Sequence, residues 1–312
     1  MQVHRNTNSL PSFKNAVITV GTFDGVHRGH QHLIHRIKKL AAEIAGESVL
    51  ITFDPHPRTV VFPEDHSVRI LSTLDEKIEL LNQLEVDHLV VAPFTREFSL
   101  LTARDYVDHF LAGKFHPAII VIGYNHQFGH HRDGNIELLR KLSADYGFRV
   151  EEITKQLVDD IEVSSTRIRI ALQEGDVKTA AHLLGHPYSL QGTVVKGNQL
   201  GRKFGYPTAN IAVADPLKLI PADGVYVVRA PFNNQVLDGV ASIGFRPTVN
   251  GRHRTIEAYL FDFDGDLYDQ QLKINFIEWL RPELKFETID LMIAEIDKDV
   301  VRAKEILAGF LK

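Results

Sequence analysis

Cysteine is absent from the 312-residue sequence, and its absence removes several classes of chemistry. Disulfide bonds, thiolate metal ligands, cysteine nucleophiles and iron–sulfur clusters all require a cysteine thiol. A chain without disulfides fits a reducing compartment, so we expect a cytoplasmic protein. Any catalysis must use histidine, carboxylate, hydroxyl or basic groups instead.

Long apolar runs and a strong excess of one charge are also missing. No apolar stretch approaches the roughly 20 residues that span a bilayer, and the segment MQVHRNTNSL lacks the apolar centre of a signal peptide. The formal net charge of -5 gives no overall attraction to nucleic acid or to an anionic membrane. We therefore expect neither as a partner, and function must be sought in local sites.

The first half of the chain shows the pattern of a parallel sheet. Val- and Ile-rich runs alternate with amphipathic stretches such as 31–46 and 73–84; the runs occupy 16–20, 48–53, 87–94, 118–123 and 148–153. Near-continuous apolar runs are typical of strands buried on both faces. This order predicts a doubly wound α/β domain of the Rossmann-like type, with ligands bound beyond the carboxyl ends of its strands.

The second half shows a different pattern. Two short helices are expected within 165–185, and segments of period two follow at 189–195, 224–230, 239–244, 255–263 and 272–280. Strands of this kind, separated by Gly, Asn and Pro, predict a small antiparallel β-barrel. Apolar residues at helical spacing in 286–307 predict a C-terminal helix across that barrel. We place the boundary near His186, which gives domains 1–185 and 186–312.

The segment GTFDGVHRGH, Gly21 to His30, joins the first predicted strand to a helix. Its glycines allow the backbone to approach a phosphate closely, and the start of the helix supplies amide donors. His27 and His30 lie three residues apart at the same place and are able to donate hydrogen bonds to phosphate oxygens. The segment therefore predicts a phosphate site, although it lacks the GK[ST] of a Walker loop.

Two alternatives remain for these histidines. Histidines near the start of a helix are commonly solvated or capping residues. The series His27, His30, His32 and His35 is also consistent with a metal site, although no nearby carboxylate has a matching spacing.

Two later segments carry the same kind of chemistry. In TFDPHPR, 52–58, two prolines stiffen a loop that follows a strand. In VSSTRIR, 163–169, hydroxyl groups and two arginines open a helix, where Ser164 or Ser165 also suits an N-cap role. Arg169 there would stabilise a pyrophosphate leaving group by charge-assisted hydrogen bonds.

Together with GYNHQFG, 123–129, these segments resemble the N-terminal domain of the prokaryotic bifunctional riboflavin kinase/FAD synthetase family. The first also resembles the HxGH box of the nucleotidylyltransferase superfamily. The resemblance implies adenylyl transfer from ATP to FMN, which yields FAD and pyrophosphate. Two departures from the family pattern are Thr22, where Asn is frequent, and Asn125 with His126, where an acidic residue and Phe are usual.

The resemblance also implies roles for individual residues. The residues implied to act on the reacting phosphates are His27, His30 and Arg169. Those implied to bind ATP are Thr22, Phe23, Asp24, Gly25, Gly29, Ser164 and Thr166. Those implied to lie on the flavin side are Pro55, Pro57 and Asn125.

The second half has its own candidate phosphate-binding segment, GTVVKGNQLGRKFGYPTAN, 192–210. Its glycines and basic residues suit a loop that folds over a polyphosphate, although an ordinary glycine-rich hairpin has the same composition. Thr208 and Asn210 are two residues apart and therefore share one face of a strand. Their side-chain oxygens are of the hard type that suits Mg²⁺.

Taken with SIGFRPT, Glu257 and LRPELKF, this segment resembles the riboflavin kinase domain of the same family. The resemblance implies that Glu257 accepts the proton of the ribityl hydroxyl and that Thr208 and Asn210 hold Mg-ATP. It implies ATP contacts from Gly197, Gly201, Arg202, Gly205 and Pro207, and flavin-side contacts from Arg281 and Glu283. Pro282 is expected at the first position of a helix.

The two halves thus imply consecutive steps, riboflavin to FMN and FMN to FAD, both with ATP and Mg²⁺. The expected partners are riboflavin, FMN, FAD and ATP. Two other hypotheses remain at this point: a kinase whose adenylyl site is degraded at Thr22, Asn125 and His126, and a flavin sensor without turnover.

Overall fold

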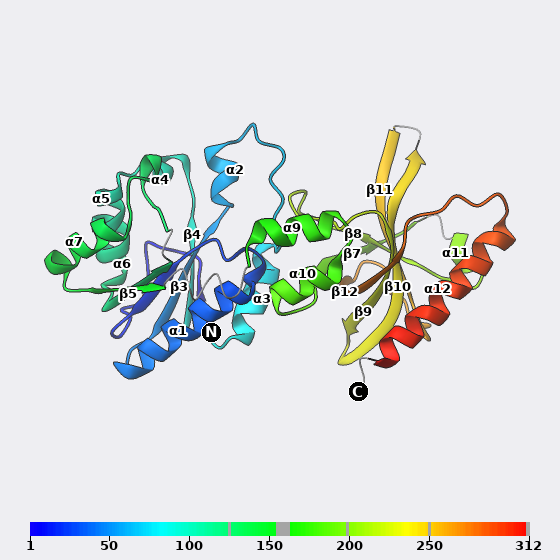
Figure 1. Cartoon of the computed structure of the whole chain (residues 1–312), viewed down its shortest axis with the longest axis horizontal. Helices are drawn as coiled ribbons and strands as arrows, with labels where there is room; N and C mark the ends of the chain where they lie inside the picture. Colours follow the sequence, from blue (N-terminus) through cyan, green and yellow to red (C-terminus); the bar gives the residue numbers. More distant parts are fainter. Residues whose placement is uncertain (124–125, 154–162, 198–199, 249–250, 310–312) are drawn as a thin grey trace. The chain divides into compact units, whose positions relative to one another are not determined.

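The structure is a computed structural model that describes residues 1–123, 126–153, 163–197, 200–248 and 251–309. The chain divides into two compact units, Met1–Ser164 and Ser165–Lys312. Two helices, α9 (Ser165–Gln173) and α10 (Val177–Leu184), belong to the second unit (Figure 1). Lys178 of α10 pairs with Glu278 of the barrel at 2.6 Å, which helps to explain why these helices group with the barrel. The boundary near His186 stays a prediction.

The first unit is built on one parallel sheet with the strand order β1-β4-β3-β2-β5-β6. The strands are β1 (Gln2–His4), β2 (Val17–Val20), β3 (Ser48–Asp54), β4 (His88–Pro93), β5 (Ile119–Gly123) and β6 (Arg149–Ile153). The longer helices are α1 (Arg28–Glu43), α3 (Leu74–Gln83) and α7 (Ile136–Tyr146). The shorter ones are η1 (Asp24–Val26), α2 (Pro57–Val61), α4 (Arg96–Ser99), α5 (Ala103–Asp105), η2 (Tyr106–Ala112), α6 (Gly113–Phe115) and η3 (His130–Arg132).

Apolar side chains cover both faces of this sheet, as the near-continuous Val and Ile runs predict. Ile18 and Val20 of β2 pack in one core with residues of η2 and α7, such as Phe110 and Leu139. Val17, on the opposite face of β2, packs in a second core with residues of α1 and α3. Alternate side chains of one strand therefore fill two separate cores.

Strand β1 was not expected from the sequence. It pairs in parallel with β4, with Gln2 opposite His88. The strand has three residues and is too short and too polar to produce an apolar pattern. Its position in the sheet depends on pairing with a strand that is distant in the sequence. Edge strands of this length leave little periodic signal in a sequence.

The second unit is a closed barrel in which β9 also pairs with β10, in the order β10-β11-β8-β7-β12-β9. The strands are β7 (Ser189–Val195), β8 (Ala209–Ala212), β9 (Gly224–Phe232), β10 (Gln235–Thr248), β11 (Gly251–Leu260) and β12 (Gln271–Arg281). A short helix, α11 (Leu200–Lys203), lies between β7 and β8. Every pairing in the barrel is antiparallel, as predicted.

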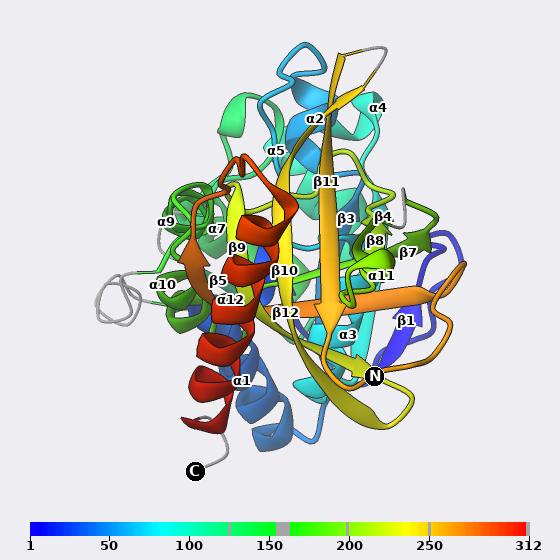
Figure 2. The same cartoon turned by 90° about the vertical axis from the view of Figure 1, so that its right-hand side faces the viewer.

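The final helix, α12 (Ile289–Gly309), packs against β9 and β10 (Figure 2). Its Ala303 and Leu307 join a core with Val225 and Val227 of β9. The prediction that Pro282 begins a helix is wrong, because Pro282 directly follows β12 and α12 starts only at Ile289.

None of the helices in the described part of the chain combines the length and apolar character that a membrane crossing requires.

Candidate functional sites

The loop between β2 and α1 has an unusual backbone. Phe23 and Val26 adopt left-handed φ values of 47° and 42°, and Gly25 between them has φ 80°. Positive φ is uncommon outside glycine and is especially unfavourable for a β-branched residue such as Val26. Such a conformation persists only where the surroundings determine it.

Hydrogen bonds to the buried side chain of Asp24 help to hold the loop in this conformation. The residue is only 3% exposed, and its Oδ1 accepts hydrogen bonds from the amides of Leu71 at 2.8 Å and Ser72 at 3.1 Å. The Ser72 hydroxyl in turn accepts from the Gly25 amide at 3.0 Å. Asp24, which the resemblance implies to bind ATP, is therefore hydrogen-bonded to the backbone of the segment just before α3.

His27 and His30 lie against each other at the start of α1. Their rings stack at 3.6 Å with an interplanar angle of 15°, and Phe23 meets His30 edge-on at 5.3 Å. The His30 amide donates to Nδ1 of His27, which serves as the N-cap of α1. His30 Nδ1 is buried and lacks a hydrogen-bond partner among the residues that the structure describes.

Three causes lower the pKa of His30 well below its usual value: burial first, then the neighbouring charges of His27 and Lys77. His30 is therefore neutral near pH 7 and offers one ring nitrogen as a donor and one as an acceptor.

Lys77 is a residue of this site that the sequence interpretation missed. It lies on α3, is only 6% exposed, and its Nζ donates to the Thr52 hydroxyl at 3.3 Å. The available signal was a lysine among the apolar positions Leu74, Ile78 and Leu81 of an amphipathic helix. Lysine is rarely buried without a partner, so this position was informative.

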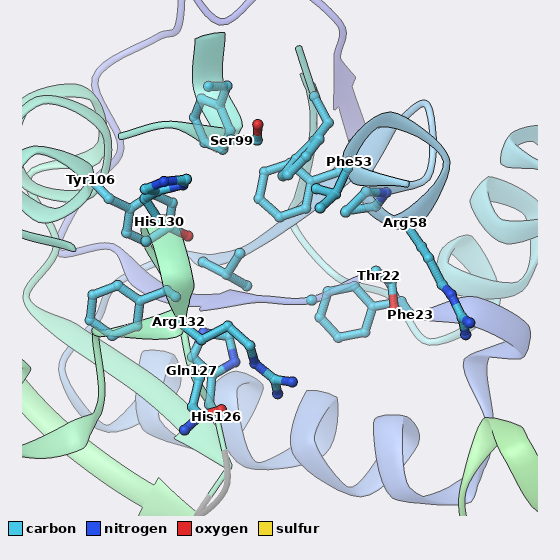
Figure 3. A pocket seen from close by; sticks show the side chains of 18 of the residues that line it. Thr22, Phe23, Phe53, Arg58, Ser99, Tyr106, His126, Gln127, His130 and Arg132 are labelled. Carbon is cyan, nitrogen blue, oxygen red and sulfur yellow. The ribbon is translucent and has the colours of Figure 1, made fainter. Parts of the chain in front are cut away.

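A cavity of about 920 Å³ opens beside the loop. Figure 3 shows Phe23, Phe53 and Tyr106 around it, with Arg58 and Arg132 among the other lining residues. Thr22, Phe23, His30 and Pro57, all expected site residues, line it together. The sequence interpretation missed most of its aromatic wall; those residues are Phe53, Phe62, Phe94, Phe98, Tyr106 and Phe128.

In the barrel, Thr208 and Glu257 are brought together. The Thr208 hydroxyl donates to Oε2 of Glu257 at 3.3 Å, and Glu257 of β11 lies opposite Asn210 of β8 in the antiparallel register. Thr208 directly precedes β8, and Asn210 is its second residue, with the buried Ala209 between them. The start of β8 and the adjacent strand β11 thus present a carboxylate, a hydroxyl and a carboxamide close together.

The glycine loop before β8 approaches its neighbours closely. A Cβ at Gly197 would lie 2.4 Å from the Asn210 side chain, and one at Gly201 would lie 2.2 Å from the Tyr206 carbonyl oxygen. Gly205 has φ 84°. A cavity of about 380 Å³ next to this loop is lined by Arg202, Pro207 and Thr208, among others.

Tyr206 links this loop to α12. Its hydroxyl donates to Asp297, and its ring meets Tyr259 edge-on at 5.3 Å. The hydrogen bond to Asp297 is the main cause that raises the pKa of Tyr206 to about 12. Tyr206 was also missed as a candidate, because nothing in the sequence relates it to a residue 91 positions away.

The two expected flavin-side residues of the barrel have other contacts here. Arg281 makes an ion pair with Asp299 of α12, with Nη2 and Oδ2 2.7 Å apart. Glu283 accepts a hydrogen bond from the Ser242 hydroxyl at 3.0 Å, and its carboxylate lies over Gly244. Both remain candidates for the flavin side, and Arg281 also ties α12 to the barrel.

Comparison with known proteins identifies the family. The sequence model described as FAD synthetase matches residues 10–167, and the one described as riboflavin kinase matches residues 184–307. A bifunctional riboflavin kinase/FMN adenylyltransferase of Listeria monocytogenes is 38% identical over 286 residues, which cover 91% of this chain and 90% of that protein. The chain belongs to the bifunctional riboflavin kinase/FMN adenylyltransferase family.

Further similarities agree with this family membership. The family member from Escherichia coli K12 is 33% identical, with 96% of this chain and 95% of that protein covered. A crystal structure described as a macrolide-efflux protein from Streptococcus pneumoniae superposes with a TM-score of 0.85 and 30% identity, and covers 97% of this chain and 98% of that one. The predicted two-domain fold is confirmed, and the chain has both riboflavin kinase and FMN adenylyltransferase activity. The kinase-only and sensor hypotheses are therefore set aside.

The remaining expected residues are placed as follows. Gly29 faces His27, because a Cβ on Gly29 would lie 3.3 Å from that ring. Pro55 follows β3, and Asn125 lies outside the described residues. Ser164 directly precedes α9, while Thr166 and Arg169 lie on α9 in the second unit. Their part in the adenylyl site stays a prediction.

Proposed function

We propose that FMN is adenylylated at the cavity that His30 and the Gly21–His30 loop border. The observation that carries this assignment is the lining of the cavity, which combines His30 with a wall of aromatic side chains. Aromatic faces suit the flat flavin ring, and the strand ends of a parallel sheet are where such folds bind ligands. Arg96 and Arg132 at the same cavity suit the FMN phosphate.

In this step an oxygen of the FMN phosphate attacks the α-phosphorus of ATP, and pyrophosphate leaves. His27, His30 and Arg169 stabilise charge on the phosphates, and no protein nucleophile takes part. Thr22, Phe23, Gly25, Gly29, Ser164 and Thr166 complete the ATP side, with Pro55, Pro57 and Asn125 toward the flavin. Asp24 acts by holding the loop, since its carboxylate accepts the Leu71 and Ser72 amides.

In the barrel, we propose Glu257 as the general base of the kinase step. It takes the proton of the riboflavin 5′-hydroxyl while the oxygen attacks the γ-phosphorus of ATP and ADP leaves. The hydrogen bond from Thr208 orients the carboxylate before substrate arrives. Gly197, Gly201, Arg202, Gly205 and Pro207 lie on the ATP side, and Arg281 and Glu283 on the flavin side.

Mg²⁺ is proposed as the metal of the kinase step. In the described part of the chain no three His, Asp or Glu side chains gather as a metal cage. Thr208 and Asn210 nevertheless offer side-chain oxygens next to Glu257, and Mg²⁺ commonly takes one or two protein oxygens with phosphates and waters. The metal would neutralise charge on the transferred phosphoryl group.

The expectation of a cytoplasmic location rests on the composition of the chain, above all on the absence of cysteine.

The test of the assignment is to supply each half-reaction separately to the purified full chain. With riboflavin, ATP and Mg²⁺, chromatography should show FMN and then FAD. The His30→Ala variant should accumulate FMN, whereas Glu257→Ala should leave riboflavin unchanged but still convert added FMN to FAD. Loss of both steps in either variant would contradict the assignment of a separate site to each step.

A further inference from the structure

Lys77 is a buried cation to which the proposed mechanism gives no role. It lies on α3, and the residue is only 6% exposed. The Glu76 side chain beside it completes the N-terminal capping box of the helix, so Lys77 is not needed to begin α3. Lysine is among the residues least often buried without a partner, so its burial here requires a cause.

Hydrogen bonds lead from Lys77 to the adenylyl-transfer loop. Its Nζ donates to Oγ1 of Thr52 at 3.3 Å, and the Thr52 hydroxyl donates to the carbonyl oxygen of Thr22 at 3.2 Å. Thr52 is fully buried on β3. The ammonium is thus connected through one side chain to the backbone that immediately precedes Phe23.

Two carboxylates also act on Lys77. Burial lowers the pKa of its ammonium, and the negative charges of Asp24 and Asp54 oppose that lowering. Asp24 belongs to the loop and Asp54 ends β3, so the charges that oppose the effect of burial come from both elements. Asp24 is buried like Lys77, so loss of the ammonium would remove a favourable positive charge from the surroundings of a buried carboxylate.

The loop itself needs such support. Phe23 and Val26 hold left-handed φ values, and Phe23 and His30 meet edge-on. Strained backbone of this kind is retained at functional sites only where neighbouring interactions over-determine it. Hydrogen bonds to two other segments hold it. The Thr52 hydroxyl donates to the Thr22 carbonyl oxygen. In the segment before α3, the Leu71 and Ser72 amides donate to Asp24, and the Ser72 hydroxyl accepts from the Gly25 amide.

We propose that Lys77 is a positioning residue for adenylyl transfer: its buried ammonium holds the strained Gly21–His30 loop through the Thr52 hydroxyl, which donates to the carbonyl oxygen of Thr22. The inference rests on the proposed adenylyl site at His30. It adds a residue that does not line the cavity and that is connected to the lining residue Thr22 through the Thr52 hydroxyl.

The charge of Lys77 has a second consequence for His30. After burial and the neighbouring His27, the positive charge of Lys77 further lowers the pKa of the His30 imidazole. The charged groups that face this pair are His27 from the start of α1, Asp24 from the loop and Asp54 from β3. Removal of the Lys77 charge should therefore raise the pKa of His30, which an architectural role alone would not do.

The experiment replaces Lys77 with the similarly shaped but uncharged methionine in the full chain. Lys77→Met should lower kcat for FMN conversion to FAD about 100-fold, the effect of a small misplacement of reacting groups. KM for ATP should change little, and the riboflavin kinase rate should stay at the parent value. The His30 imidazole signal, assigned by its loss in His30→Ala, should titrate at a higher pH by nuclear magnetic resonance.

Lys38→Met is the matched control. Lys38 lies on α1 in the same unit, and its Nζ donates to the Leu84 carbonyl at 2.8 Å, away from the loop. It should leave both kcat for FAD formation and the His30 titration unchanged. Lys77→Met and Lys38→Met variants with equal kcat and equal His30 midpoints would overturn the proposal.

Thr52→Val separates the hydrogen bond from the charge. It removes the link to Thr22 but keeps the ammonium, so kcat should fall while the His30 titration stays in place. Circular dichroism shows whether Lys77→Met stays folded at the assay temperature. If it does not, Thr52→Val tests the role of Lys77 alone, and a parental kcat for FAD formation in Thr52→Val overturns the proposal. If His30→Ala itself retains FAD formation, the proposed adenylyl site fails rather than the role of Lys77.

Discussion

The two units handle ATP with contrasting side chains. In the first, a strained loop places a neutral, partly buried His30 beside an aromatic cavity, and hydrogen bonds that Asp24 accepts hold the loop. In the second, the carboxylate of Glu257 on β11 accepts from the hydroxyl of Thr208, just before the neighbouring strand β8. The adenylyl site is thus built on a loop with strained backbone, whereas paired strands position the base of the kinase site.

The difference follows from the two reactions. A phosphate oxygen of FMN is already a nucleophile, so adenylyl transfer requires positioning and charge stabilisation. The riboflavin hydroxyl must lose a proton, so the kinase step requires a base. Paired strands are enough to hold one base, whereas both proposed sites approach the phosphates of ATP with glycine-containing loops.

The largest effect is expected from removal of the general base, which only the kinase step needs. Glu257→Gln should lower the rate of FMN formation about 1000-fold, within the range for loss of general base catalysis. FMN conversion to FAD should stay at the parent rate. Flavin chromatography under single-turnover conditions measures both. Glu278→Gln, a barrel glutamate that pairs with Lys178, is the matched control; an equal loss in that variant would indicate a structural cause.

The second prediction tests the histidines of the loop. His30→Ala should lower kcat for FAD formation about 100-fold, as expected when one group that stabilises transition-state charge is lost. The kinase rate should not change. His32→Ala, on the exposed side of α1, is the control and should be silent. A comparable loss in His32→Ala would revive the hypothesis of a histidine metal site.

The third prediction concerns the metal of the barrel. Thr208→Val removes a proposed oxygen ligand and the hydrogen bond to Glu257, and should raise the Mg²⁺ concentration needed for half-maximal kinase activity about 10-fold. The Mg²⁺ requirement of FAD formation should stay the same. Thr193→Val, which loses a hydrogen bond from Gln271 on the neighbouring strand, is the matched control. Equal Mg²⁺ requirements in the two variants would exclude Thr208 as a ligand.

The smallest effect concerns acid stability. The pKa of His30 is lowered in the folded chain. Below pH 6.5, the usual pKa of histidine, the unfolded chain therefore binds more protons at this residue than the folded chain does. The free energy of unfolding of the first unit should therefore fall with decreasing pH below 6.5, by at most about 1.4 kcal/mol per pH unit from this residue. Burial lowers the pKa of His126 too, which acts in the same direction.

Hydrogen exchange of β2 and β3 measures this slope for the first unit. The single tryptophan, Trp279, reports the second unit by fluorescence. His30→Gln should flatten the slope of the first unit, and His32→Gln should leave it unchanged. An unchanged slope in His30→Gln would mean that His30 is not held neutral in the folded chain.

Particular residues show how far the sequence could be interpreted. Repeated Val and Ile runs predicted five strands of the first sheet, but the three polar residues of β1 carried no such signal. The spacing of Thr208 and Asn210 predicted a shared strand face, and the structure adds that Glu257 pairs opposite Asn210. The aromatic wall of the cavity was not predicted, because Phe53, Phe98 and Phe128 come from separate segments with no common motif.

The sequence by itself determined the order of elements and the family, because strand and helix periods and phosphate-binding motifs are local patterns. Only the tertiary structure decided which side chains support those motifs. Lys77 reaches Thr52 from 25 positions away, and Asp24 accepts amides from 47 and 48 positions away. Such bonds depend on how α3 packs against the sheet, and burial then lowers the pKa of His30. Long-range packing leaves no periodic mark in a single sequence, so the environment of the reacting groups is visible only in the fold.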